Sequence, residues 1–200
     1  MIGTMERLRS VTRPEHLAIE RCALAQAMFH GTMTRREYAS QLAAYLRVHR
    51  ALEAAVDGAG PEVRAVWEPR RRKSPLLESD LQHLDETPVN VDAVEDLVGF
   101  IEGTCPAELP GILYVFEGST LGGTVLLPRI QAGLALAPEQ SSFYRGYGDA
   151  TSDMWCAFLE RVNALVSDAA TEDGCVAAAI ETFVRLRRVF DALWEASRAS

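Results

Sequence analysis

The sequence predicts an all-α protein, because three signals favour helices over strands. The segments Thr12–Glu15 and Thr34–Glu37 each place a glutamate three residues after a threonine, which is typical of a capped helix start. Apolar residues recur at steps of three and four over long stretches. The Asp-Gly pairs at Asp57 and Asp173 fall at the ends of helical patterns, so they do not indicate hairpins.

The first two helices follow from the capping patterns. One helix should begin at Thr12 and run to about Phe29, because His30-Gly31 is a typical helix end. A longer helix should follow Thr34 and carry an apolar stripe that faces the core. The stripe consists of Tyr38, Leu42, Tyr45, Leu46, His49, Leu52 and Val56. The Gly-Ala-Gly-Pro segment at residues 58–61 should end this helix.

The rest of the chain is also predicted to be mainly helical. Four further helices are expected at residues 74–84, 91–102, 152–169 and 172–196. A glycine-rich helix should follow Pro110 and stop before Gly133 or Pro138. Residues 141–149 contain two glycines and are expected to form a loop. Neither a repeat nor a linker divides the chain, so residues 1–200 should form a single domain.

The composition excludes several classes of function. The 200 residues include 20 Lys and Arg and 28 Asp and Glu, and the net charge of −8 argues against a nucleic-acid binder. No stretch reaches the roughly 18 apolar residues that a membrane span needs. The first ten residues do not resemble a secretory signal. Four widely spaced cysteines favour reduced thiols and a cytoplasmic location.

The segment Glu117-Gly118-Ser119-Thr120-Leu121-Gly122-Gly123 is the most unusual part of the sequence. It interrupts an apolar helical run, and each interior glycine costs a helix about 1 kcal/mol relative to alanine. Gly118 and Gly122 are four residues apart and therefore share one face of the helix. This face should approach either another helix or the plane of a cofactor. The segment lacks the lysine and the preceding strand of a nucleotide-binding loop.

His16 and Glu20 are one helical turn apart in the first predicted helix. At this spacing the carboxylate can accept a hydrogen bond from one imidazole nitrogen while the other nitrogen binds a metal. A single histidine held in this way suits the iron of a porphyrin, because the macrocycle supplies four ligands itself. A surface pair of histidine and glutamate explains the same spacing. The four histidines form neither an HExxH nor a di-iron pattern.

Together these motifs resemble the heme oxygenases, especially the bacterial ones associated with biliverdin supply to phytochromes. The resemblance covers nearly the whole chain and includes Thr12–Glu20, Met33-Thr34-Arg35, Ala51-Leu52-Glu53, Arg71-Arg72-Lys73-Ser74 with Leu77, Asp80 and Leu81, and residues 114–123. It implies a multi-helix bundle of the heme oxygenase type, with heme b between a proximal helix and a glycine-rich distal helix.

The resemblance implies roles for two groups of residues around the heme. His16 becomes the proximal iron ligand, and Glu20 becomes the hydrogen-bonding partner of that ligand. Gly118 and Gly122 become the glycines at which the distal backbone approaches the heme face. Gly123 extends this cofactor-binding segment.

The resemblance also indicates residues at the heme edge and on the distal side. Arg9 and Tyr114 are expected to contact a propionate or the heme edge. Ser119 stands where mammalian enzymes have a distal aspartate, which bacterial members also lack. His49 stands where a tyrosine of the mammalian water network is expected, and it is either a member of that network or a core histidine. Trp155 replaces a basic propionate contact.

The implied activity is cleavage of heme, as both substrate and cofactor, by O2 to biliverdin, CO and ferrous iron. Electrons must come from a ferredoxin or another reductase, because no flavin or nicotinamide motif is present. The basic run Arg70–Lys73 is either a solvated face or a docking surface for that donor. A bacteriophytochrome would receive the biliverdin. Two rival functions remain: a non-catalytic heme chaperone or sensor, and a heme-free relative that acts on small heterocycles.

Overall fold

The structure is a computed structural model that describes residues 4–166 and 168–199. These residues form helices and connecting segments without a strand, which confirms the predicted all-α fold. The α-helices are α1 (Thr4–Glu20), α2 (Ala23–His30), α3 (Arg35–Gly58), α4 (Pro61–Val66), α5 (Ser74–Gln82), α6 (Asp92–Gly103), α7 (Leu109–Leu134), α8 (Ser142–Arg145), α9 (Thr151–Leu165) and α10 (Ala169–Arg198). Three short 3-10 helices are η1 (Pro69–Arg71), η2 (Pro138–Gln140) and η3 (Gly148–Ala150). A single domain over residues 1–200 stays a prediction.

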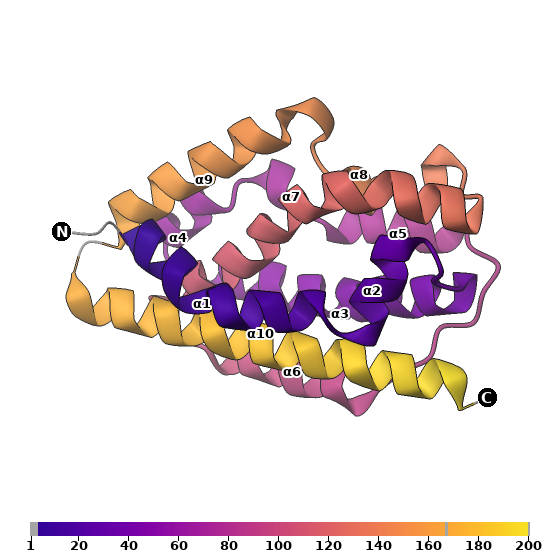
Figure 1. The fold of residues 1–200 in the computed structure, drawn as a ribbon. Helices are drawn as coiled ribbons and strands as arrows, with labels where there is room; N and C mark the ends of the chain where they lie inside the picture. The colour runs from indigo at the N-terminus through magenta and orange to yellow at the C-terminus, as the bar shows by residue number, and fades with distance from the viewer. Residues whose placement is uncertain (1–3, 167, 200) are drawn as a thin grey trace.

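The C-terminal helix α10 supports much of the bundle. It runs side by side with α1 along one edge of the molecule and also contacts α7, α6, α2 and α3 (Figure 1). α7 packs on α10 and is flanked by α2, α8 and α9. The two helices that carry the candidate residues, α1 and α7, are therefore both anchored on α10.

The predicted start of the first helix at Thr12 is wrong. α1 already begins at Thr4, and the Thr12 hydroxyl donates to the Leu8 carbonyl oxygen (2.7 Å) within the helix. Met5, Leu8 and Thr12 are buried on one side of α1. Tertiary packing of this side stabilises the helix upstream of the capping pattern, and such packing commonly outweighs local signals.

The predicted continuation of the first helix to Phe29 is also wrong. α1 ends at Glu20, and α2 begins at Ala23. Between them, the Cys22 amide donates to the Ile19 carbonyl oxygen (3.0 Å) and closes a turn. The predicted end at Gly31 is confirmed, because Gly31 has a φ of 65°, a left-handed conformation that glycine adopts readily.

The prediction for α3 is confirmed in detail. The Thr34 hydroxyl accepts from the Glu37 amide (3.1 Å), and the Glu37 carboxylate accepts from the Thr34 amide (2.7 Å). Apart from the half-buried Leu46, the whole apolar stripe of this helix is buried. α3 ends at Gly58, as the Gly-Ala-Gly-Pro segment predicts.

The predictions for α5, α6 and α7 are confirmed, but residues 141–149 are not a simple loop. They contain α8 and the start of η3. The buried Asp80 carboxylate accepts from the amides of Ser142 and Phe143, each at 2.8 Å. The cap of α8 thus comes from α5, about 60 residues earlier, and local composition carries no signal for it.

The last two helices are close to their predicted positions. α9 ends at Leu165, four residues before the predicted end at Ala169. α10 begins earlier than predicted because Asp168 caps it and accepts from the Thr171 amide (3.0 Å). Among the described residues, no helix has the length and apolar character to cross a membrane.

Candidate functional site

His16 lies on α1 with 56% of its side chain exposed. Its Nδ1 lies 3.5 Å from Glu20 Oε1, as their one-turn spacing predicts. The ring packs edge-on against Phe183 of α10, with 5.8 Å between the ring centroids. In the part of the chain that the structure describes, no side chain pairs with the second ring nitrogen, Nε2. This nitrogen therefore has the chemistry and the access that a metal ligand needs.

The three glycines of the distal segment have different surroundings. A Cβ added to Gly118 would lie 3.4 Å from the Trp155 ring, an ordinary contact, whereas one added to Gly122 would meet nothing within 4 Å. A Cβ added to Gly123 would lie only 2.9 Å from the Tyr144 carbonyl oxygen. The open side of α7 is therefore at Gly122. The glycine at 123 instead lets α7 pack closely on the backbone of α8.

The open side of α7 is apolar. Leu121 and Val125 flank Gly122 and are 36% and 52% exposed. Large apolar side chains that gather on an exposed surface often indicate a binding site. This stretch of α7 can therefore accept a flat apolar ligand against its backbone.

The hydroxyl groups of this segment bond within α7. Ser119, Thr120 and Thr124 each donate to the carbonyl oxygen three residues earlier, at 2.7, 2.6 and 2.7 Å. Such bonds, together with glycines, commonly bend helices. α7 changes direction midway along its length (Figure 1). The Ser119 side chain is exposed, so its oxygen can still accept a hydrogen bond from a ligand or water.

α1 and α7 approach each other at Tyr114. Burial raises the pKa of the half-buried Tyr114 phenol, while a hydrogen bond with the Thr12 side chain and the charge of Arg9 oppose this rise. His16 lies one turn after Thr12, and Gly118 lies one turn after Tyr114. Both helices run away from the same end of the molecule (Figure 1). The structure thus brings Arg9 and Thr12 of α1 close to Tyr114 of α7, while His16 and Gly118 each lie one turn further along their own helix.

His49 lies in the core of the protein and is only 2% exposed. Its ring centroid is 5.2 Å from that of Phe116, 5.8 Å from that of Phe143 and 6.2 Å from that of Tyr45. Burial, assisted by the charge of Lys73, lowers the pKa of His49 to about 3. The imidazole is therefore neutral at physiological pH. These surroundings favour a core histidine over a residue that delivers protons as an imidazolium.

The low pKa of His49 predicts how the stability of the protein depends on pH. The unfolded pKa is about 6.5, so the neutral ring contributes its full stability above pH 6.5, and this contribution is lost as the pH falls towards 3. When the pH is lowered from 7 to 5, the free energy of unfolding should decrease in both proteins. The decrease should be about 2 kcal/mol smaller in His49→Phe than in the wild type. Urea unfolding at both pH values measures the difference. Equal losses would show that His49 takes up a proton in the folded state.

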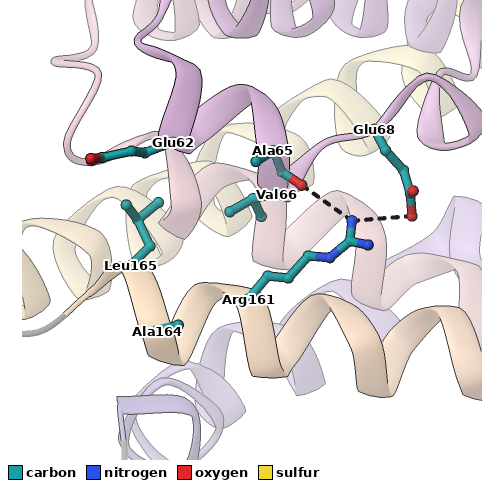
Figure 2. Close-up of a pocket in the computed structure, with 7 residues that line it drawn as sticks. All are labelled: Glu62, Ala65, Val66, Glu68, Arg161, Ala164 and Leu165. Carbon is teal, nitrogen blue, oxygen red and sulfur yellow. Dashed lines mark hydrogen bonds and ion pairs between the residues drawn. The ribbon is translucent and has the colours of Figure 1, made fainter.

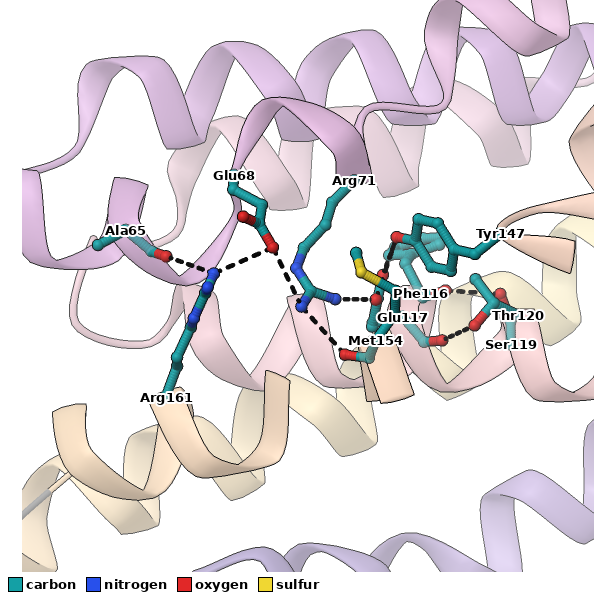
Figure 3. Close-up of polar contacts among 10 residues, drawn as sticks. All are labelled: Ala65, Glu68, Arg71, Phe116, Glu117, Ser119, Thr120, Tyr147, Met154 and Arg161. Carbon is teal, nitrogen blue, oxygen red and sulfur yellow. Dashed lines mark hydrogen bonds and ion pairs between the residues drawn. The ribbon is translucent and has the colours of Figure 1, made fainter. Parts of the chain in front are cut away.

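A buried ion pair involves the first residue of the glycine segment, and no sequence pattern named above predicted it. Arg71 and Glu117 are both fully buried and form a salt bridge through Arg71 Nη1 and Glu117 Oε1. The Tyr147 hydroxyl donates to the same carboxylate, at 2.9 Å from Oε2 (Figure 3). A glutamate directly after the apolar run Tyr114–Phe116 was the available signal, because a buried carboxylate requires a partner.

The interpretation of Arg70–Lys73 as a continuous basic surface is wrong. Arg71 is fully buried, and the Lys73 side chain is 2% exposed, with Nζ 3.6 Å from the centre of the Tyr147 ring. Arg72 forms a salt bridge with Asp57. η1 and the following turn direct alternate side chains inward, so two of the four charges are not available to a docking partner.

A cavity lies away from these residues. It has a volume of about 790 Å³ and lies between α4 and α9 (Figure 2). Its lining residues are Glu62, Ala65, Val66, Glu68, Arg161, Ala164 and Leu165. Arg161 bonds to the Ala65 carbonyl oxygen (3.1 Å) and to Glu68 (3.2 Å) across its mouth. None of the predicted site residues lines it, so the exposed His16 and the open side of α7 at Gly122 remain the better candidates.

A family model described as heme oxygenase matches residues 3–192 of the chain. A comparison with curated protein sequences found no match. The fold is similar to that of heme oxygenase-1 from the cyanobacterium Synechocystis in complex with heme, with a TM-score of 0.84 and 20% identity over 98% of this chain and 96% of that one.

Two further solved structures have a similar fold. Heme oxygenase from Leptospira interrogans aligns with a TM-score of 0.87 and 21% identity over 94% of this chain and 98% of that one. Heme oxygenase-2 from Synechocystis, in complex with heme and NO, aligns with a TM-score of 0.88 and 20% identity over 98% of this chain and 87% of that one. These likenesses confirm the predicted bundle.

Proposed function

Because the chain belongs to the heme oxygenase family, we propose that it cleaves heme b with O2 and external electrons to biliverdin, CO and ferrous iron. The observation that carries the proposal is the approach of α1 and α7 at Thr12 and Tyr114, because α1 carries an exposed imidazole and α7 carries an open glycine face. The heme complexes among the structural neighbours support a heme substrate.

The residues of the two helices fit a heme. His16 Nε2 has no partner among the described residues, and Nδ1 is close to Glu20, which orients the ring and fixes its tautomer. Gly122 leaves space next to the α7 backbone, and Leu121 and Val125 offer apolar surface beside it. Heme would lie between these groups, with its iron bound by His16.

Bound heme supplies the iron centre that reacts with O2 and the porphyrin that is cleaved. The protein residues orient it and control water. Arg9 would hold a propionate by its charge, and the Tyr114 hydroxyl would contact the heme edge next to it. The Ser119 hydroxyl donates its hydrogen bond to the Phe116 carbonyl oxygen. It would therefore accept a hydrogen bond from a distal water rather than donate one.

The external components belong to the same proposal. Electrons come from a ferredoxin or another reductase, since the chain carries no flavin or nicotinamide motif. All four cysteines are free thiols, which supports a cytoplasmic protein. The biliverdin would serve a bacteriophytochrome, a proposal that rests on the sequence resemblance.

A hemin titration followed by a turnover assay tests this function. The protein should bind one equivalent of hemin and give a sharp Soret band. Adding ascorbate or a reductase system in air should remove this band while bile-pigment absorbance grows. A stable heme spectrum under these conditions would indicate a non-catalytic heme binder and would contradict the proposed activity.

A further inference from the structure

Glu117 is the first residue of the glycine segment and is fully buried. It accepts from Arg71 Nη1 and from the Tyr147 hydroxyl. We infer that the cluster Arg71–Glu117–Tyr147 holds the glycine segment of α7 in position and thereby determines which edge of the heme is attacked. The second half of this inference rests on the proposed function, whereas the first half concerns the protein without heme.

The cluster connects α7 to three other elements. Arg71 comes from η1, and its Nη2 donates to the Met154 carbonyl oxygen of α9 (3.0 Å). The same Nη2 lies 3.6 Å from Glu68, which in turn pairs with Arg161 of α9 (Figure 3). Tyr147 comes from the turn between α8 and η3. Glu117 is thus the point at which α7 joins a chain of polar contacts that spans this side of the bundle.

The part of the glycine segment that precedes Gly123 needs such a fixed point, because only Gly123 packs closely on the backbone of α8. A Cβ added to Gly118 would meet only the Trp155 ring, and one added to Gly122 would meet nothing within 4 Å. Glycine also offers the backbone more conformational freedom than other residues. An arginine that binds a carboxylate fixes both distance and direction. A small displacement of a reacting group can lower a rate about 100-fold, so the position of this segment matters for the reaction.

A purely structural role is the competing explanation, and Glu53 provides a matched control. Its carboxylate is also buried, with 6% of the residue exposed, and it accepts from the amides of Lys73 (2.8 Å) and Ser74 (3.1 Å). These bonds cap the start of α5 and do not touch α7. Glu53→Gln should therefore lower stability without moving the glycine segment.

Hydrogen exchange of the heme-free protein tests the positioning role. In Glu117→Gln, amides 117–124 should exchange about 10-fold faster than in the wild type, and Tyr147→Phe should give a smaller increase in the same amides. The Tyr147 variant retains the ion pair and so guards against loss of folding. Glu53→Gln should leave these amides unchanged. Equal exchange in all four proteins would overturn the inference.

The product provides the second readout. Glu117→Gln and Tyr147→Phe should both bind hemin with the wild-type stoichiometry but give a changed ratio of biliverdin isomers. Turnover should be about 10- to 100-fold lower in Glu117→Gln than in the wild type. Glu53→Gln should retain the wild-type isomer ratio. An unchanged isomer ratio in Glu117→Gln would overturn the role in orientation. Failure of the wild type to bind hemin would reject the proposed function, while the exchange data would still decide whether the cluster positions α7.

Discussion

Replacing His16 with alanine should abolish heme degradation and leave the fold intact. Nε2 is the nitrogen that would bind iron, and of the described histidines only His16 pairs with a carboxylate one turn away, which can orient its ring. Changing a group that merely supports a metal ligand typically costs 10- to 100-fold in affinity or activity, so loss of the ligand itself should cost about 100-fold or more. His16 is more than half exposed, so the free energy of unfolding should change by about 0.5 kcal/mol at most.

Three measurements separate this outcome from a general defect. Turnover of hemin should fall in His16→Ala, and the Soret band should shift because the iron loses its imidazole. Added imidazole should restore part of the band and part of the activity, since the substitution leaves room for it. His30→Ala, a change of another exposed histidine, should behave like the wild type. Full activity of His16→Ala would refute iron ligation by this residue.

Local signals predicted those parts of the fold whose stabilising contacts lie close in sequence. The cap of α3 is made by Thr34 and Glu37, three residues apart, and both its start and its buried stripe were predicted. The cap of α8 is made by Asp80 from another helix, and the predicted loop was wrong. The pattern at Thr12 resembles a cap, but burial of Met5 and Leu8 stabilises the helix upstream of it, so that the helix begins at Thr4.

The same distinction holds for the candidate site. The spacing of His16 and Glu20 and the glycine segment lie within single helices, so they were visible in the sequence. The pairing of Arg71 with Glu117 joins residues 46 positions apart. Arg71, which the sequence suggested to be on the surface, is therefore buried in an ion pair. The sequence also grouped Gly122 with Gly123, because only the packing of α8 distinguishes an open glycine from a structural one.

Gly122→Leu should block heme binding while making the heme-free protein more stable. A Cβ at this position meets nothing within 4 Å, so the new side chain fits the heme-free fold. Leucine is also a much better helix former than glycine, and the free energy of unfolding should rise by about 0.5–1 kcal/mol. The same side chain would occupy the face at which heme meets the α7 backbone. Overpacking costs about 1–3 kcal/mol, which corresponds to hemin affinity about 10- to 100-fold weaker.

The opposite signs of the two effects make this substitution decisive, because a damaged fold would lower stability and affinity together. Thr124→Leu is the control, since Thr124 is exposed on the same helix but points away from the Gly118–Gly122 face. It should leave hemin affinity unchanged. Thermal unfolding of the heme-free proteins and hemin titration measure the two quantities. If Gly122→Leu bound hemin as tightly as the wild type, heme would not lie against this part of α7, and the glycines would need another explanation.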